Sequence, residues 1–443
     1  MNNTCKDNRK LSIVQNTLFN SAGSFFYLLC SWLTTVIVVK LGSVEFAGIL
    51  SLSMAVTNMF FSVSTFGIRT YQVSDVARKY TADDYVTTRL QTCAGAFVLC
   101  AAYTAASGVT RVEAACIMAF MLFKIGESLS DENQALQQIA ERMDYIFVSF
   151  VLLGTLMILA FTGMLYAMKD LRAALLAMAG STLLVVMLYE FPISRKLSGF
   201  RLKFNPAVTR NLLKDSLPLL ANSLLMVLMV SIPRTRLNAI WGNYWMGIYG
   251  SVAAPAAIVQ SAALWVFMPS LGQLAAFWGK KDRKAFVSLD RRLLCLLGGM
   301  SALVLLGAVL FGHWGLALIF GEEIAAHGEL LLPTLAGTML IALEYYLSSV
   351  LTVMRKMKSI VIANAAGLAL TLALSDVFIR MQGANGVNSV VCMAMSLNCL
   401  MMGAVAWRSL GALDADLPGG PGEAAGRLPG PREFLRRLWR KKD

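Results

Sequence analysis

The sequence predicts an all-α, polytopic membrane protein with about twelve transmembrane helices. Of its 443 residues, 57% are hydrophobic and only 15% are charged, and the mean hydropathy is +0.62. A soluble domain carries about a quarter charged residues, so this chain cannot cover itself with a water-facing surface. Its apolar residues form long continuous blocks, near the ~20 residues that span hydrocarbon, and not the short alternating segments of a barrel. Backbone in lipid must be hydrogen-bonded internally, which favours helices.

Twelve apolar blocks follow one another along the chain, and each is a predicted transmembrane helix. If the N-terminus is cytoplasmic, the loops on that side hold most of the 39 basic residues, whereas the opposite loops hold only Lys40, Arg111, Lys169, Arg172 and Arg380. This bias predicts that both termini are cytoplasmic and that the number of spans is even. The predicted spans are 13–39, 46–68, 87–107, 112–130, 143–166, 172–191, 217–240, 244–272, 285–311, 325–352, 358–378 and 386–407.

The composition also excludes several classes of function. The formal charge of +13 does not indicate nucleic-acid binding, because the basic residues follow membrane topology and face anionic lipids. Seven of the eight cysteines lie in apolar spans without a CxxC pair, and His313 and His327 have no clustered acids beside them. No metal and no cofactor are therefore expected. The chain has no Walker motif, nucleophile elbow or HExxH, and its outer loops are short, so an enzyme is disfavoured.

The chain divides into two halves that look like faint copies of each other. Gly42 and Gly48 of the first half recur as Gly242 and Gly247 of the second, at an offset near 200 residues. Six spans in each half make this a parallel repeat, related by an axis along the membrane normal. The predicted parts are an N-lobe (1–191), a basic amphipathic cytoplasmic linker (192–216), a C-lobe (217–408) and a flexible basic cytoplasmic tail (409–443), whose REFLRRLWRKK stretch fits either a membrane-surface helix or an unstructured end.

Charged residues inside the spans are candidate functional residues, since a charge in hydrocarbon needs a partner or a watery cavity. The seventh span contains Pro233, Arg234 and Arg236, and the proline is expected to break or kink the helix. Two interpretations stay open for the arginines: they snorkel to the outer headgroups, or they form a cationic patch for an anionic substrate. Because they lie two residues apart, only one of them can face a cavity on a regular helix.

Two further spans carry informative polar residues. The first span is rich in small polar side chains, Asn20 among them, which is typical of a helix that lines an aqueous path or packs closely on its neighbours. The fourth span holds Lys124, Glu127 and Asp131 on one face, which predicts an internal salt-bridge ladder, with a substrate or ion contact as the alternative. The first, seventh and eighth spans hold no Asp or Glu in their apolar portions, which disfavours a cation-coupled exporter of organic cations.

Two stretches resemble a known family of transporters. The FGIRTYQVSD run from Phe66 to Asp75 and the KIGESLSDENQALQQIAERMDYI run from Lys124 to Ile146 are similar to Wzx-type flippases, the polysaccharide-transporter branch of the multidrug/oligosaccharidyl-lipid/polysaccharide exporter superfamily. The resemblance covers residues 10–408. It implies two six-helix lobes around a central cavity in the bacterial cytoplasmic membrane, working by alternating access. The cargo that it implies is an undecaprenyl-pyrophosphate-linked oligosaccharide repeat unit, moved from the inner to the outer leaflet for cell-surface polysaccharide biosynthesis.

The cavities of such flippases are typically cationic, so we expect Arg234 and Arg236 to bind substrate, together with Asn20 and Lys124. Arg69 is a further candidate, although its place at the inner end of its span fits a topological role slightly better. The expected partners are the lipid-linked oligosaccharide, anionic membrane lipids and a polysaccharide polymerase. The competing functions are a cation-coupled drug or metabolite exporter of the same superfamily, and a membrane polymerase or glycosyltransferase.

Overall fold

The computed structural model describes residues 12–75 and 78–415, and the predicted tail helix near the C-terminus lies outside these limits. The described residues form helices and no strand, which confirms the predicted all-α class. The helices are α1 (Ile13–Leu41), α2 (Val44–Thr65), α3 (Ile68–Ser74), α4 (Ala82–Ala106), α5 (Arg111–Ile139), α6 (Met143–Met168), α7 (Leu171–Val185), α8 (Phe191–Ser198), α9 (Pro206–Ala253), α10 (Ala256–Phe267), α11 (Leu271–Gly279), α12 (Arg283–Phe320), α13 (Glu322–Ala325), α14 (Leu331–Val353), α15 (Met357–Gln382) and α16 (Asn385–Ala415).

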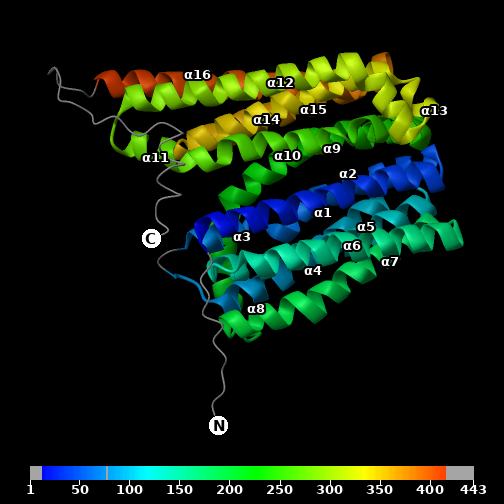
Figure 1. Cartoon of the computed structure of the whole chain (residues 1–443), viewed down its shortest axis with the longest axis horizontal. Helices are drawn as coiled ribbons and strands as arrows, with labels where there is room; N and C mark the ends of the chain where they lie inside the picture. The colour runs from blue at the N-terminus through cyan, green and yellow to red at the C-terminus, as the bar shows by residue number, and fades with distance from the viewer. Residues whose placement is uncertain (1–11, 76–77, 416–443) are drawn as a thin grey trace, which may run out of the picture.

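The long helices give the twelve predicted membrane crossings. Within the described part of the chain, nine helical stretches are long and apolar enough to span a membrane. One of them, Pro206–Gly279, contains two crossings: the first part of α9 runs one way, and its last part returns with α10 and α11 (Figure 1). Helices α4 and α5, which carry buried charged side chains, complete the set.

The turn between the seventh and eighth crossings lies at a glycine, in the gap between the predicted spans 217–240 and 244–272. Pro233 is buried inside α9, and the helix continues through it. The one residue of α9 with non-helical backbone angles is Gly242, at φ 81° and ψ −178°. Only glycine adopts this region readily, because it lacks a Cβ atom. Of the two predicted effects of Pro233, the break is therefore absent, and the kink stays a prediction.

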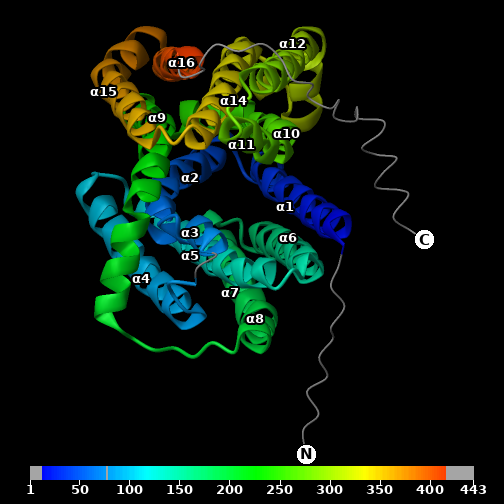
Figure 2. The ribbon, with the colours of Figure 1, turned by 90° about the vertical axis from the view of Figure 1, so that its left-hand side faces the viewer.

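The two halves of the chain form two helical lobes, seen one above the other in Figure 2. Helix α2 of the first lobe packs along α9, and the repeat-related glycines meet at this contact. A Cβ atom on Gly48 would lie 1.8 Å from the carbonyl oxygen of Asn243, and one on Gly247 would lie 2.0 Å from that of Val44. The lobes thus touch backbone to backbone at the end of the bundle where α1 turns into α2.

The segment 192–216, predicted as a linker, is mostly helical. It comprises most of α8, a short non-helical stretch, and the first turns of α9, which begins at Pro206. These turns pack on the first lobe: Leu212 is buried with Ile68, Tyr80 and Tyr85, side chains from α3, α4 and the loop between them. Helix α9 therefore joins the lobes along its length, and the exact domain limits stay a prediction.

The FGIRTYQVSD run builds the sharp turn between α2 and α4. Phe66 and Gly67 both have left-handed backbone angles, and Gly67 lies so close to Leu219 of α9 that a Cβ atom would be 2.6 Å from it. Asp75 accepts hydrogen bonds from the backbone N–H groups of Lys79 and Tyr80, which hold the pKa of its carboxyl group below the ordinary value. This motif therefore has a structural role at the junction of the lobes.

The predicted topology can be tested by cysteine labelling with a membrane-impermeant maleimide. Ser198→Cys, at the end of α8, is expected to react only after the inner face is exposed, whereas Glu322→Cys, in α13, should react from outside. The helices α8 and α13 lie at opposite ends of the bundle (Figure 1). The wild-type protein gives the background from its eight native cysteines. Labelling of Ser198→Cys in intact cells would contradict the orientation derived from the basic residues.

Candidate substrate cavity

A cavity of about 430 Å³ lies between the two lobes. Helices α1 and α2 line it from the first lobe, and α9, α10 and α14 line it from the second. The first and seventh spans, which the sequence singled out for their polar residues, both contribute to its wall. The lining is mainly apolar, with methionine, valine, leucine and alanine side chains from both lobes.

Arg234 is the only charged residue among the 24 described residues that line this cavity. Its guanidinium carbon lies 5.7 Å from the centre of the Tyr249 ring, so a cation–π contact holds the side chain in place. Its Nε atom is buried and makes no hydrogen bond within the described structure. A half-buried cation with a free donor is suited to bind an anionic group, because arginine presents several donors in a fixed planar geometry.

The rest of the polar lining is uncharged. Trp32 contributes an indole Nε1–H that is buried without a partner in the described structure, and Tyr345 contributes a phenol group. No carboxylate is found among the described lining residues, although one of the lining helices, α14, carries the buried Glu344. The hydroxyl and amide groups come from Ser31, Thr35, Ser51, Asn58, Ser62, Ser231, Gln260 and Thr338.

Two of the predicted substrate residues lie away from this cavity. Arg236 points to another side of α9, where its Nε atom lies 3.4 Å from Oδ1 of Asp376 on α15. Both side chains are about half exposed, so this is a surface ion pair. Asn20 is half-buried on α1 and is not one of the lining residues. Of the two neighbouring arginines, only Arg234 faces the cavity, as the helical spacing required.

Lys124 lies behind the cavity wall. Its Nζ atom is 2.6 Å from Oε2 of Glu127, and the other carboxylate oxygen accepts a hydrogen bond from Tyr27 of α1. The ammonium group also lies 5.0 Å from the ring centre of Phe61, which itself lines the cavity. The predicted ion pair between Lys124 and Glu127 is thus present. Asp131, the third member of the predicted ladder, is bound elsewhere.

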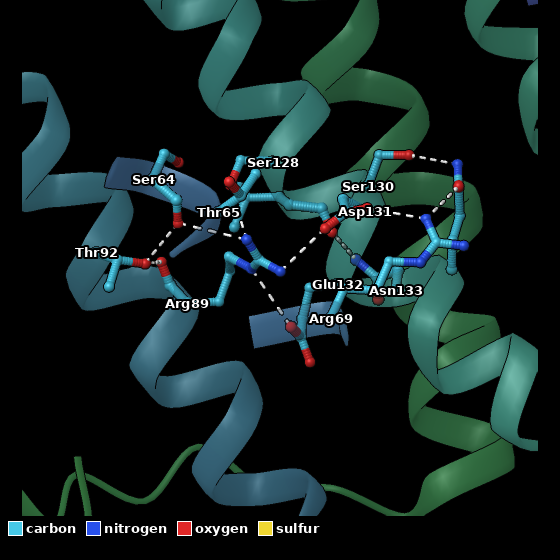
Figure 3. Close-up of polar contacts among 12 residues, drawn as sticks. Ser64, Thr65, Arg69, Arg89, Thr92, Ser128, Ser130, Asp131, Glu132 and Asn133 are labelled. Atoms are coloured by element: carbon cyan, nitrogen blue, oxygen red, sulfur yellow. Dashed lines mark hydrogen bonds and ion pairs between the residues drawn. The ribbon is translucent and has the colours of Figure 1, made fainter. Parts of the chain in front are cut away.

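Asp131 lies in a second network, which Figure 3 shows. Its two carboxylate oxygens bind two arginines: Arg69 at 2.8 Å and Arg89 at 3.0 Å. Arg89 is fully buried and also lies 3.3 Å from Glu132. Arg69 additionally donates to the amide oxygen of Gln138 at 3.0 Å and does not line the cavity. These groups tie α3, α4 and α5 together inside the first lobe.

The sequence did not reveal several buried polar residues. Arg89 lies close to the start of its predicted span, where a basic residue is expected to face the cytoplasm, yet it is fully buried. Glu190, in the π-helical turn that joins α7 to α8, accepts hydrogen bonds from Ser130 and Ser149. Glu344 of α14 is fully buried, and neither of its carboxylate oxygens has a hydrogen-bond partner within the described structure. The described residues contain no group of three or more His, Cys, Asp or Glu side chains that could hold a metal.

The arrangement of two helical lobes around a cavity is the fold of solved flippases and multidrug exporters. The lipid II flippase MurJ in an inward closed conformation matches with a TM-score of 0.67 and 11% identity, over 91% of this chain and 94% of that one. The MATE multidrug transporter DinF-BH matches with a TM-score of 0.64 and 14% identity, over 89% and 94% of the two chains. These proteins are transporters and not enzymes.

In sequence, the chain is similar to the capsular polysaccharide biosynthesis protein CapF of Staphylococcus aureus. The two are 23% identical over 348 residues, which are 76% of this chain and 85% of the relative. No family model matches the chain. The similarity to a capsular polysaccharide protein, together with the shared fold of flippases and multidrug exporters, agrees with the resemblance to Wzx-type flippases.

Proposed function

We propose that this protein flips an undecaprenyl-pyrophosphate-linked oligosaccharide from the inner to the outer leaflet by alternating access, for cell-surface polysaccharide biosynthesis. The observation that carries the proposal is Arg234, the only charged residue among the described residues that line the cavity between the lobes. The similarity to a capsular polysaccharide biosynthesis protein supports the class of cargo.

The chemistry of the cavity matches such a head group. A pyrophosphate linked to sugars cannot cross ~30 Å of hydrocarbon unaided, because its charge would lose its hydration. The guanidinium group of Arg234 can offer two parallel, charge-assisted hydrogen bonds to phosphate oxygens. The hydroxyl and amide groups around it, with the unpartnered indole N–H of Trp32, supply donors and acceptors for sugar hydroxyls.

The lobes offer one side on which a lipid tail could remain in the bilayer. On the α2 side they pack tightly through Gly48 and Gly247. On the α1 side, Phe25 of α1 and Trp265 of α10 meet with ring centres 6.0 Å apart, and 46% and 41% of these side chains are exposed. Two exposed rings separate more readily than closely packed backbones, so we place the path of the tail between α1 and α10.

The alternative function is export of a drug or metabolite, as in the multidrug transporters that share the fold. An organic cation would be expected to bind a carboxylate in the cavity, where the charge can be balanced. The described lining offers a cation instead. The cavity therefore favours an anionic cargo.

Deletion of the gene in its native host tests the proposal. Mass spectrometry of lipid extracts should show an accumulating undecaprenyl-pyrophosphate oligosaccharide, and the mass of the glycan names the cargo. The wild-type gene should reverse this accumulation, whereas a gene encoding Arg234→Ala should not. A deletion strain with normal lipid-linked intermediates but altered drug sensitivity would contradict the flippase and support the exporter.

A further inference from the structure

A second groove, of about 390 Å³, lies where the start of α9 meets the first lobe. Its polar wall is formed by Arg210 and Lys214 of α9, and its apolar wall by Phe66, Leu213 and Leu217. Figure 2 shows this part of α9 beside α4, and the two helices are joined by a hydrogen bond between Thr88 and Thr209 at 3.4 Å. The groove is separate from the cavity between the lobes, and the two share no lining residue.

The two cations of this groove are not neutralised by any residue that the structure describes. Arg210 and Lys214 are exposed, and neither makes an ion pair with a described residue. They are four residues apart, so their side chains lie on one face of α9. The nearest acid in the sequence, Asp215, points elsewhere: its carboxylate binds Lys79 at 2.6 Å and the hydroxyl of Tyr80 at 2.7 Å. The groove therefore has an unbalanced positive charge.

The cations and the apolar residues of this groove lie at different depths along α9. Helix α9 rises about 16 Å from Pro206 to Leu217, at about 1.5 Å per residue. The cations lie toward the end expected in the cytoplasm, whereas Leu217, with 53% of its side chain exposed, lies deeper in the membrane. A phosphate at the membrane surface with acyl chains directed into the bilayer has the same arrangement of charge and hydrocarbon.

We infer that this groove binds an anionic phospholipid of the inner leaflet. The phosphate is held between Arg210 and Lys214, and the upper part of an acyl chain packs on Phe66, Leu213 and Leu217. Phe66 belongs to the turn after α2, whereas Arg210 and Lys214 belong to α9. The bound lipid thus bridges the first lobe and the helix that leads into the second. This inference is independent of the cargo proposed above.

Native mass spectrometry of the purified full-length protein tests this site, with phosphatidylglycerol as the probe and phosphatidylcholine, a zwitterionic lipid without net charge, as the comparison. The wild type should retain phosphatidylglycerol preferentially. The double variant Arg210→Gln with Lys214→Gln should bind it about thirty-fold more weakly, since each cation near the membrane surface contributes about one kcal/mol to the attraction of an anionic lipid. Arg210→Lys with Lys214→Arg should retain most of the binding.

The matched control is Arg195→Gln with Lys196→Gln, which removes two exposed charges from α8 outside the groove. This control, and the cavity variant Arg234→Gln, should bind phosphatidylglycerol like the wild type. Equal retention of phosphatidylglycerol and phosphatidylcholine by the wild type would overturn the inference without any variant. Unchanged binding by the Arg210 and Lys214 double variant, or an equal loss in the α8 control, would also overturn it.

Discussion

Replacement of Arg234 by alanine is expected to abolish polysaccharide export while the protein stays at its normal level in the membrane. Truncation of a buried charged partner at a binding site typically costs 2–5 kcal/mol, so the rate of flipping at limiting substrate should fall by about 30-fold or more. Arg234→Lys should recover part of the activity, because the charge remains but the planar, bidentate group does not. Export in cells and flipping in reconstituted vesicles measure the effect.

Arg236→Ala is the matched control for this experiment. Arg236 lies two residues away on the same helix, has the same charge, and makes a surface ion pair with Asp376. The Arg236→Ala protein should therefore export polysaccharide nearly as well as the wild type. If Arg234→Ala exports normally, or if the two alanine variants are equally inactive, the cavity cation does not bind the cargo.

Replacement of Arg89 by methionine is expected to reduce the stability of the protein severely. Arg89 is fully buried between Asp131 and Glu132, and Glu132 is itself 2% exposed. Removal of one partner from a buried ion pair leaves the other charge uncompensated and costs about 3–5 kcal/mol. The fraction of monodisperse protein that survives heating in detergent measures the loss.

Arg111→Met provides the control, because Arg111 is exposed at the first turn of α5. A surface substitution of this kind usually changes stability by less than about 0.5 kcal/mol. Adding Glu132→Gln to Arg89→Met should restore part of the stability, since it removes one of the unpaired charges. An Arg89→Met protein as heat-resistant as the wild type would show that the network contributes nothing to the fold.

The fold class and the transmembrane helices could be predicted because the membrane imposes them. Length and hydropathy of each apolar block decide whether a helix can span the bilayer, and no knowledge of neighbours is needed. The ends of the helices were harder to predict. The predicted seventh span begins at residue 217, whereas α9 begins at Pro206, because its first turns are stabilised by burial of Leu212 on the first lobe. The turn between the two crossings of α9 was predicted in the right place, because Gly242, the one residue of α9 with non-helical backbone angles, lies between the predicted spans 217–240 and 244–272.

The candidate site could be predicted only in part. The cationic character of the cavity was expected, and Arg234 supplies it. The sequence could not distinguish Arg234 from Arg69 or Lys124, because this depends on which acids lie nearby in the folded protein. Arg69 is bound by Asp131 and Lys124 by Glu127, whereas no acid approaches Arg234 among the described residues. Pairings between helices that are distant in sequence need the tertiary structure.

The glycine contact between α2 and the returning part of α9 has a consequence for the way the lobes move in each transport cycle. At Gly48 and Gly247 the main chains of α2 and α9 meet directly, and apolar side chains of the two helices, Val44 and Ile248 among them, are buried beside this contact. Parting the lobes here would expose that apolar surface. The contact is therefore suited to act as a pivot that stays closed while the exposed rings of Phe25 and Trp265 separate on the other side.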